Sequence, residues 1–255
     1  SADEGEWTAR RIAAIQAYLE WMPIREDAPA LQGKIYRQFR IGNMATLIML
    51  DTRMIGRDVQ VINKEIDRIH DPNRQLLGAE QEGWLAEQFA TSVRSRSTWT
   101  VLGQQVMFAP QTPTGTVAGN ADSWDGYRGA RGGVFDMIER AKVSNLAVLT
   151  GDVHSSWAFD VPRDPFAGYD STTGKGSLGV EFAGTSVTSP SSIGRDGQKQ
   201  LDDLRSARPH LRYVDGRYRG YYIVDMTRDR LQADYYAVET IQERSAKERF
   251  EKGFI

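Results

Sequence analysis

Several residue types that support particular functions are scarce or missing in this sequence. None of its 255 residues is cysteine, which excludes disulfides, thiolate nucleophiles and thiolate-bound metals within the chain. Histidine occurs only three times, so few imidazoles are available for catalysis or metal binding. No run approaches the ~18 consecutive apolar residues of a membrane-spanning helix. We therefore expect neither thiol chemistry nor a membrane span.

The chain also lacks an excess of charge of either sign. Its 32 basic and 34 acidic residues give a net charge of −2, so no basic field favours a nucleic-acid scaffold as partner. A content of 40% hydrophobic and 26% charged residues is typical of a globular domain.

The sequence opens on Ser1 and shows no signal peptide, which suggests a processed or trimmed polypeptide. We expect residues 1–255 to form one structural unit with a sizeable core.

Hydrophobic patterning predicts an α/β fold. Helices are expected over 7–21, 78–93 and 134–142, with a charged helical tail over 239–250. Strands are expected over 45–51, 97–108, 146–150, 179–183, 220–226 and 231–238. The last two of these strands are expected to form a hairpin through 227–230. A long loop is expected over 110–133. Helices alternate with strands in the first half and strands dominate the second, which predicts a mixed sheet or layered sandwich flanked by helices.

The segment Asn145-Leu-Ala-Val-Leu-Thr-Gly-Asp-Val-His-Ser-Ser-Trp157 is the most informative in the chain. Its apolar run stops at Gly151 and delivers Asp152 and His154. If the strand geometry continues, both side chains face one site, with Cα atoms about 7 Å apart. The pair suits Fe, Mn, Zn or Ca at the strand end where α/β sheets bind ligands. From the residues alone, metal ligation and simple capping of a turn are equally open.

Two further polar segments allow both a structural and a functional interpretation. Asp51-Thr52-Arg53 ends the first predicted strand. An internal ion pair between Asp51 and Arg53 that orders the loop is favoured over an Arg53 that faces a phosphate. Asp122-Ser-Trp-Asp-Gly-Tyr127 combines carboxylates with aromatic rings. Trp124 and Tyr127 could wall a substrate cleft or anchor a rigid Asp-Gly turn.

The remaining candidates carry weaker signals. His70 ends a helix, where a histidine usually complements the helix dipole at the surface. His210 precedes the final hairpin, and a position away from the site is favoured over contact with the site. The hydroxyl-rich segment 184–190 could line a phosphate pocket or form a plain turn.

Several of these segments, in this order, together resemble the alkaline phosphatase D family of PhoD-like metallophosphatases. The matching segments are Ala14-Ile-Gln-Ala-Tyr-Leu-Glu-Trp-Met-Pro-Ile-Arg25, Leu50-Asp-Thr-Arg53, Leu77-Gly-Ala-Glu-Gln-Glu-Gly-Trp-Leu85, Trp99-Thr-Val-Leu-Gly-Gln-Gln-Val106, Ser123-Trp-Asp-Gly-Tyr127, Leu149-Thr-Gly-Asp-Val-His-Ser-Ser-Trp157 and Pro209-His-Leu-Arg-Tyr213. The likeness spans nearly the whole chain.

The resemblance implies a four-layer α/β/β/α sandwich of mixed sheets with a metal centre between them. It implies metal-dependent hydrolysis of phosphate esters, by attack of a metal-bound hydroxide or oxide on phosphorus, in the periplasm or outside the cell. Asp152 and His154 match the family's late metal-binding motif and are the expected metal-binding and catalytic residues. Arg53, Trp124 and Tyr127 are expected to contact the substrate. Calcium and iron are the metals that the resemblance implies.

The chain departs from the family in one respect. The family's earlier motifs, including an Asp-Asp-His-Glu-type segment, lie upstream of the region that resembles residues 7–25, so the chain resembles the carboxyl-terminal part of such an enzyme. Because a multi-metal centre needs several ligands per ion, we expect this chain to supply one flank of the active site. The amino-terminal portion, as a separate polypeptide, is then an expected partner. The alternative is a non-catalytic module that keeps the fold for binding or structure.

Overall fold

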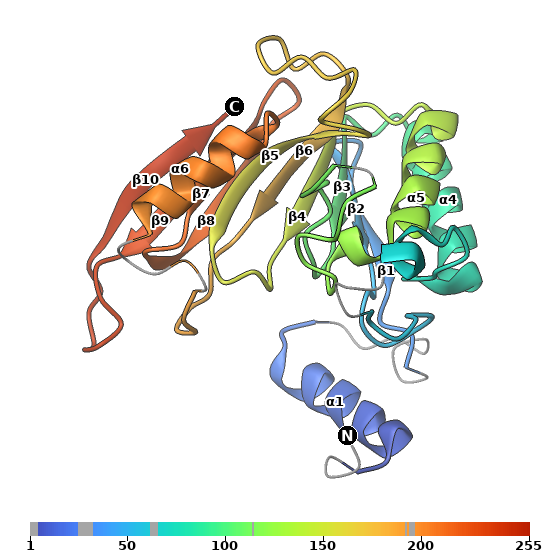
Figure 1. Cartoon of the computed structure of the whole chain (residues 1–255). Coiled ribbons are helices and arrows are strands. Elements are labelled where there is room, and N and C mark those ends of the chain that lie inside the picture. The colour runs from blue at the N-terminus through green and yellow to red at the C-terminus, as the bar shows by residue number, and fades with distance from the viewer. Residues whose placement is uncertain (1–4, 25–32, 62–65, 114, 192, 194–196) are drawn as a thin grey trace.

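A computed structural model describes residues 5–24, 33–61, 66–113, 115–191, 193 and 197–255. Figure 1 shows the arrangement of the helices and strands. The elements in chain order are α1 (Trp7–Trp21), β1 (Arg37–Ile41), β2 (Ala45–Met49), α3 (Ile66–His70), α4 (Gly78–Arg94), β3 (Trp99–Gly103), the 3₁₀ turn η2 (Trp124–Gly126), α5 (Arg128–Ala141), β4 (Leu146–Thr150), β5 (Ser156–Pro162), β6 (Ser177–Ala183), α6 (Gln198–Ala207), β7 (Leu211–Asp215), β8 (Arg219–Met226), β9 (Leu231–Val238) and β10 (Glu248–Phe254).

The larger sheet has seven strands in the order β1-β2-β3-β4-β6-β5-β7. Its centre is parallel: β2 pairs with β3, β3 with β4, and β4 with β6. β1 pairs antiparallel with β2, and β5 lies antiparallel between β6 and β7. The carboxyl ends of β2, β3, β4 and β6 therefore meet at one edge of the sheet. The loops at this edge carry most of the residues that the sequence singles out.

The two faces of the larger sheet are covered differently. One face packs against α4, α5 and α6, through side chains such as Phe89, Phe135 and Leu201. The other face packs against a three-stranded sheet, β10-β9-β8, where Phe182 and Tyr235 belong to one buried cluster. In Figure 1, α4 and α5 lie together near β2 and β3, and α6 lies near β7. The expected α/β class is confirmed, and the described residues form three layers, α/β/β, of the expected four.

The predicted helical tail over 239–250 is wrong. Residues 248–254 form β10, which pairs antiparallel with β9. Charged residues with good helix propensity suggest a helix there, but Phe254 packs into the cluster between the two sheets, close to Phe182 and Tyr213. Tertiary packing on an available strand edge therefore overrides the local preference.

The predicted loop over 110–133 is also too long, because α5 begins at Arg128 and not at 134. The glycines of 128–133 suggest a loop, but Gly129 belongs to the helix, where close packing requires it. A Cβ at this position would lie 2.8 Å from the backbone of Pro72. The buried Arg131 then pairs with Asp125 at 2.6 Å across the start of the helix. Close packing and a buried ion pair thus turn a glycine-rich segment into the first turns of a helix.

Other elements differ less from expectation. The helices over 7–21 and 78–93 and the hairpin of β8 and β9 are confirmed. β3 ends at Gly103, five residues before the predicted end. β1, β5, β7 and α6 were not predicted from the sequence. Within the described residues, no helix is both long and apolar enough to cross a bilayer.

Candidate metal and phosphate site

The loop after β4 carries Asp152 and His154 in an unusual backbone conformation. Both residues adopt left-handed conformations, with φ of 67° and 55°. The sequence-based expectation of extended geometry at this point is therefore wrong, because the strand ends at Thr150 and the chain turns sharply. Asp and His tolerate this region better than most residues, yet positive φ is uncommon outside glycine and often marks functional sites. The loop thus presents both side chains by a turn and not by the alternation of a strand.

Arg53 connects this loop to two other segments. Its Nη2 donates to Oδ1 of Asp152 at 2.8 Å, and its Nη1 donates to Oδ2 of Asp122 at 2.7 Å. Arg57 donates to the other oxygen of Asp122 at 2.6 Å. Burial alone would lower the pKa of Arg53, but the hydrogen bond and charge of Asp122, together with Asp152, outweigh it and raise the pKa. The structure therefore brings together two of the predicted site residues, Arg53 and Asp152.

The favoured interpretation of Asp51-Thr52-Arg53 is only half right. Asp51 does order the loop, but through the backbone: its Oδ1 accepts from the N–H groups of Arg53 at 2.9 Å and Met54 at 2.8 Å. Its carboxylate makes no ion pair with the Arg53 guanidinium, which turns instead to Asp122 and Asp152. This orientation places Arg53 at the carboxyl edge of the sheet, where Asp122 and Asp152 balance the charges of Arg53 and Arg57.

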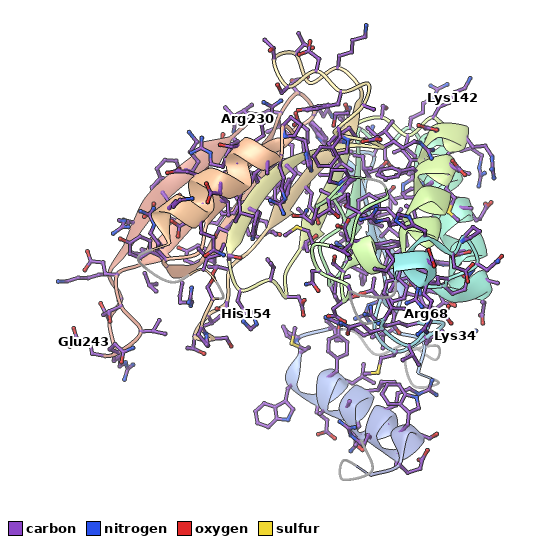
Figure 2. The ribbon with its side chains drawn as sticks, viewed as in Figure 1. Lys34, Arg68, Lys142, His154, Arg230 and Glu243 are labelled. Atoms are coloured by element: carbon purple, nitrogen blue, oxygen red, sulfur yellow. The ribbon has the colours of Figure 1, made fainter. Side chains whose placement is uncertain are left out.

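His154 is oriented by the segment that follows β6. Its Nδ1 lies 3.0 Å from the carbonyl oxygen of Pro190. Because a carbonyl only accepts, Nδ1 must carry the hydrogen, which leaves the Nε2 lone pair available for a metal. Figure 2 shows His154 at the edge of the larger sheet that faces α1. Pro190 belongs to the segment 184–190 that the sequence singled out, and the predicted phosphate contacts of its hydroxyls stay a prediction.

Trp124 and Tyr127 lie in the interior, and neither forms an exposed wall of a cleft. Both side chains are fully buried. The Tyr127 hydroxyl donates to the Asp58 carbonyl at 2.8 Å, and its ring lies between the guanidinium groups of Arg57 and Arg74. The structure thus shows the rigid-turn alternative: the two rings anchor the loop that carries Asp122. Direct substrate contact, predicted for both, would require them to leave the core.

A buried hydrogen-bond network below the site was missed in the sequence. Glu181 of β6 is fully buried and accepts from the N–H groups of Phe108 at 2.8 Å and Ala109 at 2.6 Å. It also accepts from the hydroxyl of Thr150 at 2.6 Å, and Thr150 in turn accepts from Gln104 at 2.6 Å. Burial raises the pKa of Glu181, and these hydrogen bonds oppose the rise. The network ties the end of β4, two residues before Asp152, to the turn after β3.

The other two histidines lie away from Asp152. His210 is fully buried, and its Nε2 lies 2.8 Å from the Pro110 carbonyl. Burial lowers its pKa to about 4, so it is neutral at physiological pH. His70 ends α3 and lies near Arg128, with 3.5 Å between Nε2 and Nη1. Neither joins the site, in agreement with the favoured structural interpretations.

Asp152 and His154 carry ligand types that are suited to a metal ion. A carboxylate and an imidazole with a free Nε2 are suitable ligands for iron, manganese, zinc or calcium. Among the described residues, no cluster of three or more His, Asp or Glu side chains is close enough to hold a metal ion. A metal centre that used Asp152 and His154 would therefore need further ligands.

Comparisons with known proteins show the family of the chain. A family model described as PhoD-like phosphatase matches residues 1–235. Alkaline phosphatase D of Bacillus subtilis (strain 168) is 39% identical in an alignment of length 248 that covers 93% of this chain and 40% of that protein. The chain thus spans about two-fifths of the length of this curated relative.

Two solved structures resemble the chain. A structure of PhoD is 35% identical, with a TM-score of 0.79, over 96% of this chain and 46% of that chain. A purple acid phosphatase from yellow lupin (Lupinus luteus) seeds is 11% identical, with a TM-score of 0.52, over 92% of this chain and 34% of that chain. The second likeness shows the fold alone.

Proposed function

Because the chain belongs to the PhoD-like phosphatase family, we propose that it takes part in metal-dependent hydrolysis of phosphate esters and supplies one flank of the active site. The observation that supports this proposal is the group formed by Asp152, His154 and Arg53 at the carboxyl edge of the sheet. Arg53 donates to Asp152 at 2.8 Å, and His154 follows two residues later in the same loop. In α/β sheets this edge is where ligands bind.

Each residue has a distinct part in the proposed reaction. Asp152 and His154 hold the metal, with Pro190 fixing the ring of His154 so that Nε2 is the ligand. When bound, the metal polarises the phosphate and makes a water more acidic. Arg53 binds phosphate oxygens through its guanidinium, whose planar fork matches their geometry. Asp122 and Arg57 keep Arg53 in place before the substrate arrives.

We propose calcium and iron as the metals, on the basis of the family resemblance. The donor set of this chain is compatible with both, because carboxylate oxygen suits calcium and imidazole suits iron. Elemental analysis of the purified protein tests the assignment. Zinc or manganese in stoichiometric amount, with neither calcium nor iron, would contradict it.

We propose that the other metal ligands come from a further polypeptide segment, on this chain's polypeptide or on a separate one. Two observations support this: no three His, Asp or Glu side chains of the described residues are close enough to hold a metal ion, and the chain matches two-fifths of its curated relative. Apolar side chains of α1 are also exposed, with Trp21 84% accessible. Mass spectrometry of the natural protein, after crosslinking, would identify such a segment beside Asp152.

A periplasmic or extracellular location is also part of the proposal and rests on the family resemblance. Cell fractionation with an antibody to the chain tests it. A signal confined to the cytoplasmic fraction would contradict the proposal.

The decisive experiment measures phosphate release and metal content together. We expect Asp152→Ala to abolish turnover and lower bound metal, and a chelator to abolish turnover of the unmodified protein. Asp136→Ala is the matched control, because Asp136 is an exposed carboxylate on α5 that pairs with Arg163. Turnover that resists both the chelator and the Asp152 substitution would overturn the proposal. A protein that binds no metal and hydrolyses nothing would favour the non-catalytic module.

A further inference from the structure

The charges around Arg53 balance one another. Its two terminal nitrogens are both engaged: Nη1 donates to Asp122 at 2.7 Å, and Nη2 donates to Asp152 at 2.8 Å. Arg57 pairs with the other oxygen of Asp122 at 2.6 Å. Two guanidinium groups thus face two carboxylates, and the group as a whole has no net charge with which to attract an anion. The phosphate contact proposed for Arg53 therefore requires one of these carboxylates to be neutralised.

Arg57 cannot take the place of Arg53, because its donors are used within the protein. Its Nη1 donates to the Thr52 carbonyl at 3.0 Å, and its Nη2 donates to the carbonyl and the carboxylate of Asp122 at 2.9 and 2.6 Å. Its guanidinium carbon lies 4.8 Å from the centre of the Tyr127 ring, and its side chain is 12% exposed. Arg53, with a side chain that is 34% exposed, is the cation that an anion can reach.

The two carboxylates that pair with Arg53 differ in how firmly they are held. Asp122 pairs with a different arginine through each of its oxygens. Asp152 is the more exposed of the two, and among the described residues its carboxylate accepts a hydrogen bond from Arg53 alone. It also lies in the sharply turned loop after β4, with φ of 67°. Asp152 is therefore the carboxylate that a cation from solvent can reach and neutralise.

The cavity beside Arg53 offers no route for an anion. This cavity, of about 560 Å³, lies between α1 and the β1–β2 edge, and apolar residues such as Leu47 and Met49 form most of its lining. Asp51 also lines it, and the Oδ2 atom of Asp51 is buried without a hydrogen-bond partner among the described residues. A buried carboxylate oxygen in this state needs a donor and repels an anion. A phosphate therefore approaches Arg53 from the exposed side, where Asp152 lies.

We propose that Asp152 acts as an electrostatic gate on Arg53. While its carboxylate is charged and binds no cation, it occupies Nη2 of Arg53 and repels a phosphate. A cation that binds Asp152 neutralises it, and Nη2 is then available to a phosphate oxygen, with Nη1 still held by Asp122. The inference rests on the proposed function, which names the two ligands as a metal ion and a phosphate ester. It adds that their binding is cooperative, because each ligand favours the arrangement that the other needs.

The first test measures phosphate binding in the absence of metal. Inorganic phosphate is titrated into the full chain in the presence of a chelator and followed by calorimetry. Asp152→Asn keeps the shape of the side chain and removes its charge, and asparagine tolerates the left-handed backbone at this position. We expect this variant to bind phosphate about tenfold more tightly than the unmodified chain, because a like charge beside the anion is gone. Loss of a residue that served only as a metal ligand would not strengthen phosphate binding.

Asp136→Asn is the matched control for net charge. Asp136 is an exposed carboxylate on α5 that pairs with Arg163 at 2.7 Å, in an ion pair that includes neither Arg53 nor Asp122. The substitution changes the charge of the chain by the same amount as Asp152→Asn. We expect it to change phosphate affinity by less than about twofold, because salt screens exposed charges that lie apart from the anion.

A second substitution of Asp152 separates the gate from an effect on the fold. Asp152→Gly removes the whole carboxylate, and glycine adopts a positive φ without strain. We expect about the same tenfold gain in phosphate affinity as in Asp152→Asn. Urea denaturation of both variants verifies that each is folded under the conditions of the titration.

Arg53→Gln, added to Asp152→Asn, locates the bound phosphate. Glutamine leaves a polar side chain at this position and removes the guanidinium. We expect the affinity to return to within about twofold of that of the unmodified chain, because the released guanidinium is the group that binds the anion.

The outcomes separate the gate from the proposed function. The gate is overturned by an unchanged phosphate affinity in both Asp152 variants, by an equal gain in Asp136→Asn, or by a gain that persists after Arg53→Gln. Each of these results counts against it even when the protein hydrolyses phosphate esters. If the Asp152 variants gain affinity as expected but the metal-loaded unmodified protein hydrolyses no ester, the gate stands and the phosphatase function fails.

Discussion

Two loops at the same edge of the larger sheet are built in opposite ways. Residues 104–111 and 121–127, between β3 and α5, are mostly buried and are held by Glu181, His210 and the Asp125–Arg131 pair. The loop after β4 is short, strained and open to solvent, with the Asp152 side chain 41% exposed. One loop is support and the other carries the proposed chemistry. Strained, exposed residues on a rigid base are a common design of functional sites.

The buried Asp125–Arg131 pair is expected to have the largest effect on stability. Asp125→Ala leaves Arg131, whose side chain is 7% exposed, without its partner at 2.6 Å. We expect a loss of about 4 kcal/mol in the free energy of unfolding, because a buried charge is left uncompensated. Urea denaturation measures it. A loss below about 1 kcal/mol would show that the long loop does not depend on this pair.

His210 makes the stability of the same loop depend on pH. Its pKa in the folded protein is about 4, below the ordinary value of 6.5, because it is buried. The unfolded chain therefore binds a proton between pH 6.5 and 4 that the folded chain does not, so the stability present above pH 6.5 is lost as the pH falls. The expected loss is about 3 kcal/mol in unfolding free energy.

The control for this prediction is His210→Gln, which removes the titrating group. Urea denaturation at several pH values, for both proteins, measures the difference. Unmodified protein and variant that lose stability in parallel between pH 6.5 and 4 would show that His210 titrates normally in the folded state.

The Glu181 network is expected to have an intermediate effect. Glu181→Gln replaces one acceptor oxygen by a donor, so one of the buried N–H groups of Phe108 and Ala109 loses its partner. We expect a loss of about 2 kcal/mol and weaker metal binding, because Thr150 leads into the metal loop. Ser92→Ala is the control, since its hydroxyl meets Thr100 at 2.8 Å near the start of β3, away from the site. If both variants lose metal affinity equally, Glu181 does not position the loop.

Asp152 is expected to have the smallest effect on stability. The ion pair of Asp152 with Arg53 is partly exposed, so Asp152→Asn is expected to change the unfolding free energy by less than about 1 kcal/mol. The same substitution is expected to remove metal binding, measured by elemental analysis and calorimetry. A large loss of stability with unchanged metal binding would reverse the roles of the two loops.

The hydrophobic pattern of the sequence predicts the helices and strands that have a local periodicity. The amphipathic helices and the apolar strands β2 and β4 have clear signals, because one buried face dictates the spacing. β1, with its arginines, and β10, with four charged residues, lack such a signal and form because neighbouring strands offer an edge. Strand pairing of this kind depends on residues far apart in the chain, so no local window contains it.

The candidate site could be predicted only in part, because some of its residues are neighbours in the sequence and others are far apart. Gly151, Asp152 and His154 stand together in the sequence and mark a strand end. Arg53 was ambiguous, because its partners Asp122 and Asp152 are 69 and 99 residues away. Glu181 carried no visible signal, since a single glutamate in a strand reads as a surface residue until its burial is known.

The sequence by itself determined the family and the α/β class, and it predicts Asp152 and His154 as metal ligands. These follow from residue types in a fixed order and from local periodicity. The tertiary structure alone decided that Arg53 turns to Asp152 and not to Asp51, that Trp124 and Tyr127 are buried, and that an apolar cavity opens beside Arg53. The physical reason is that charge pairing, burial and empty volume arise between segments distant in sequence, and only folding sets their distances.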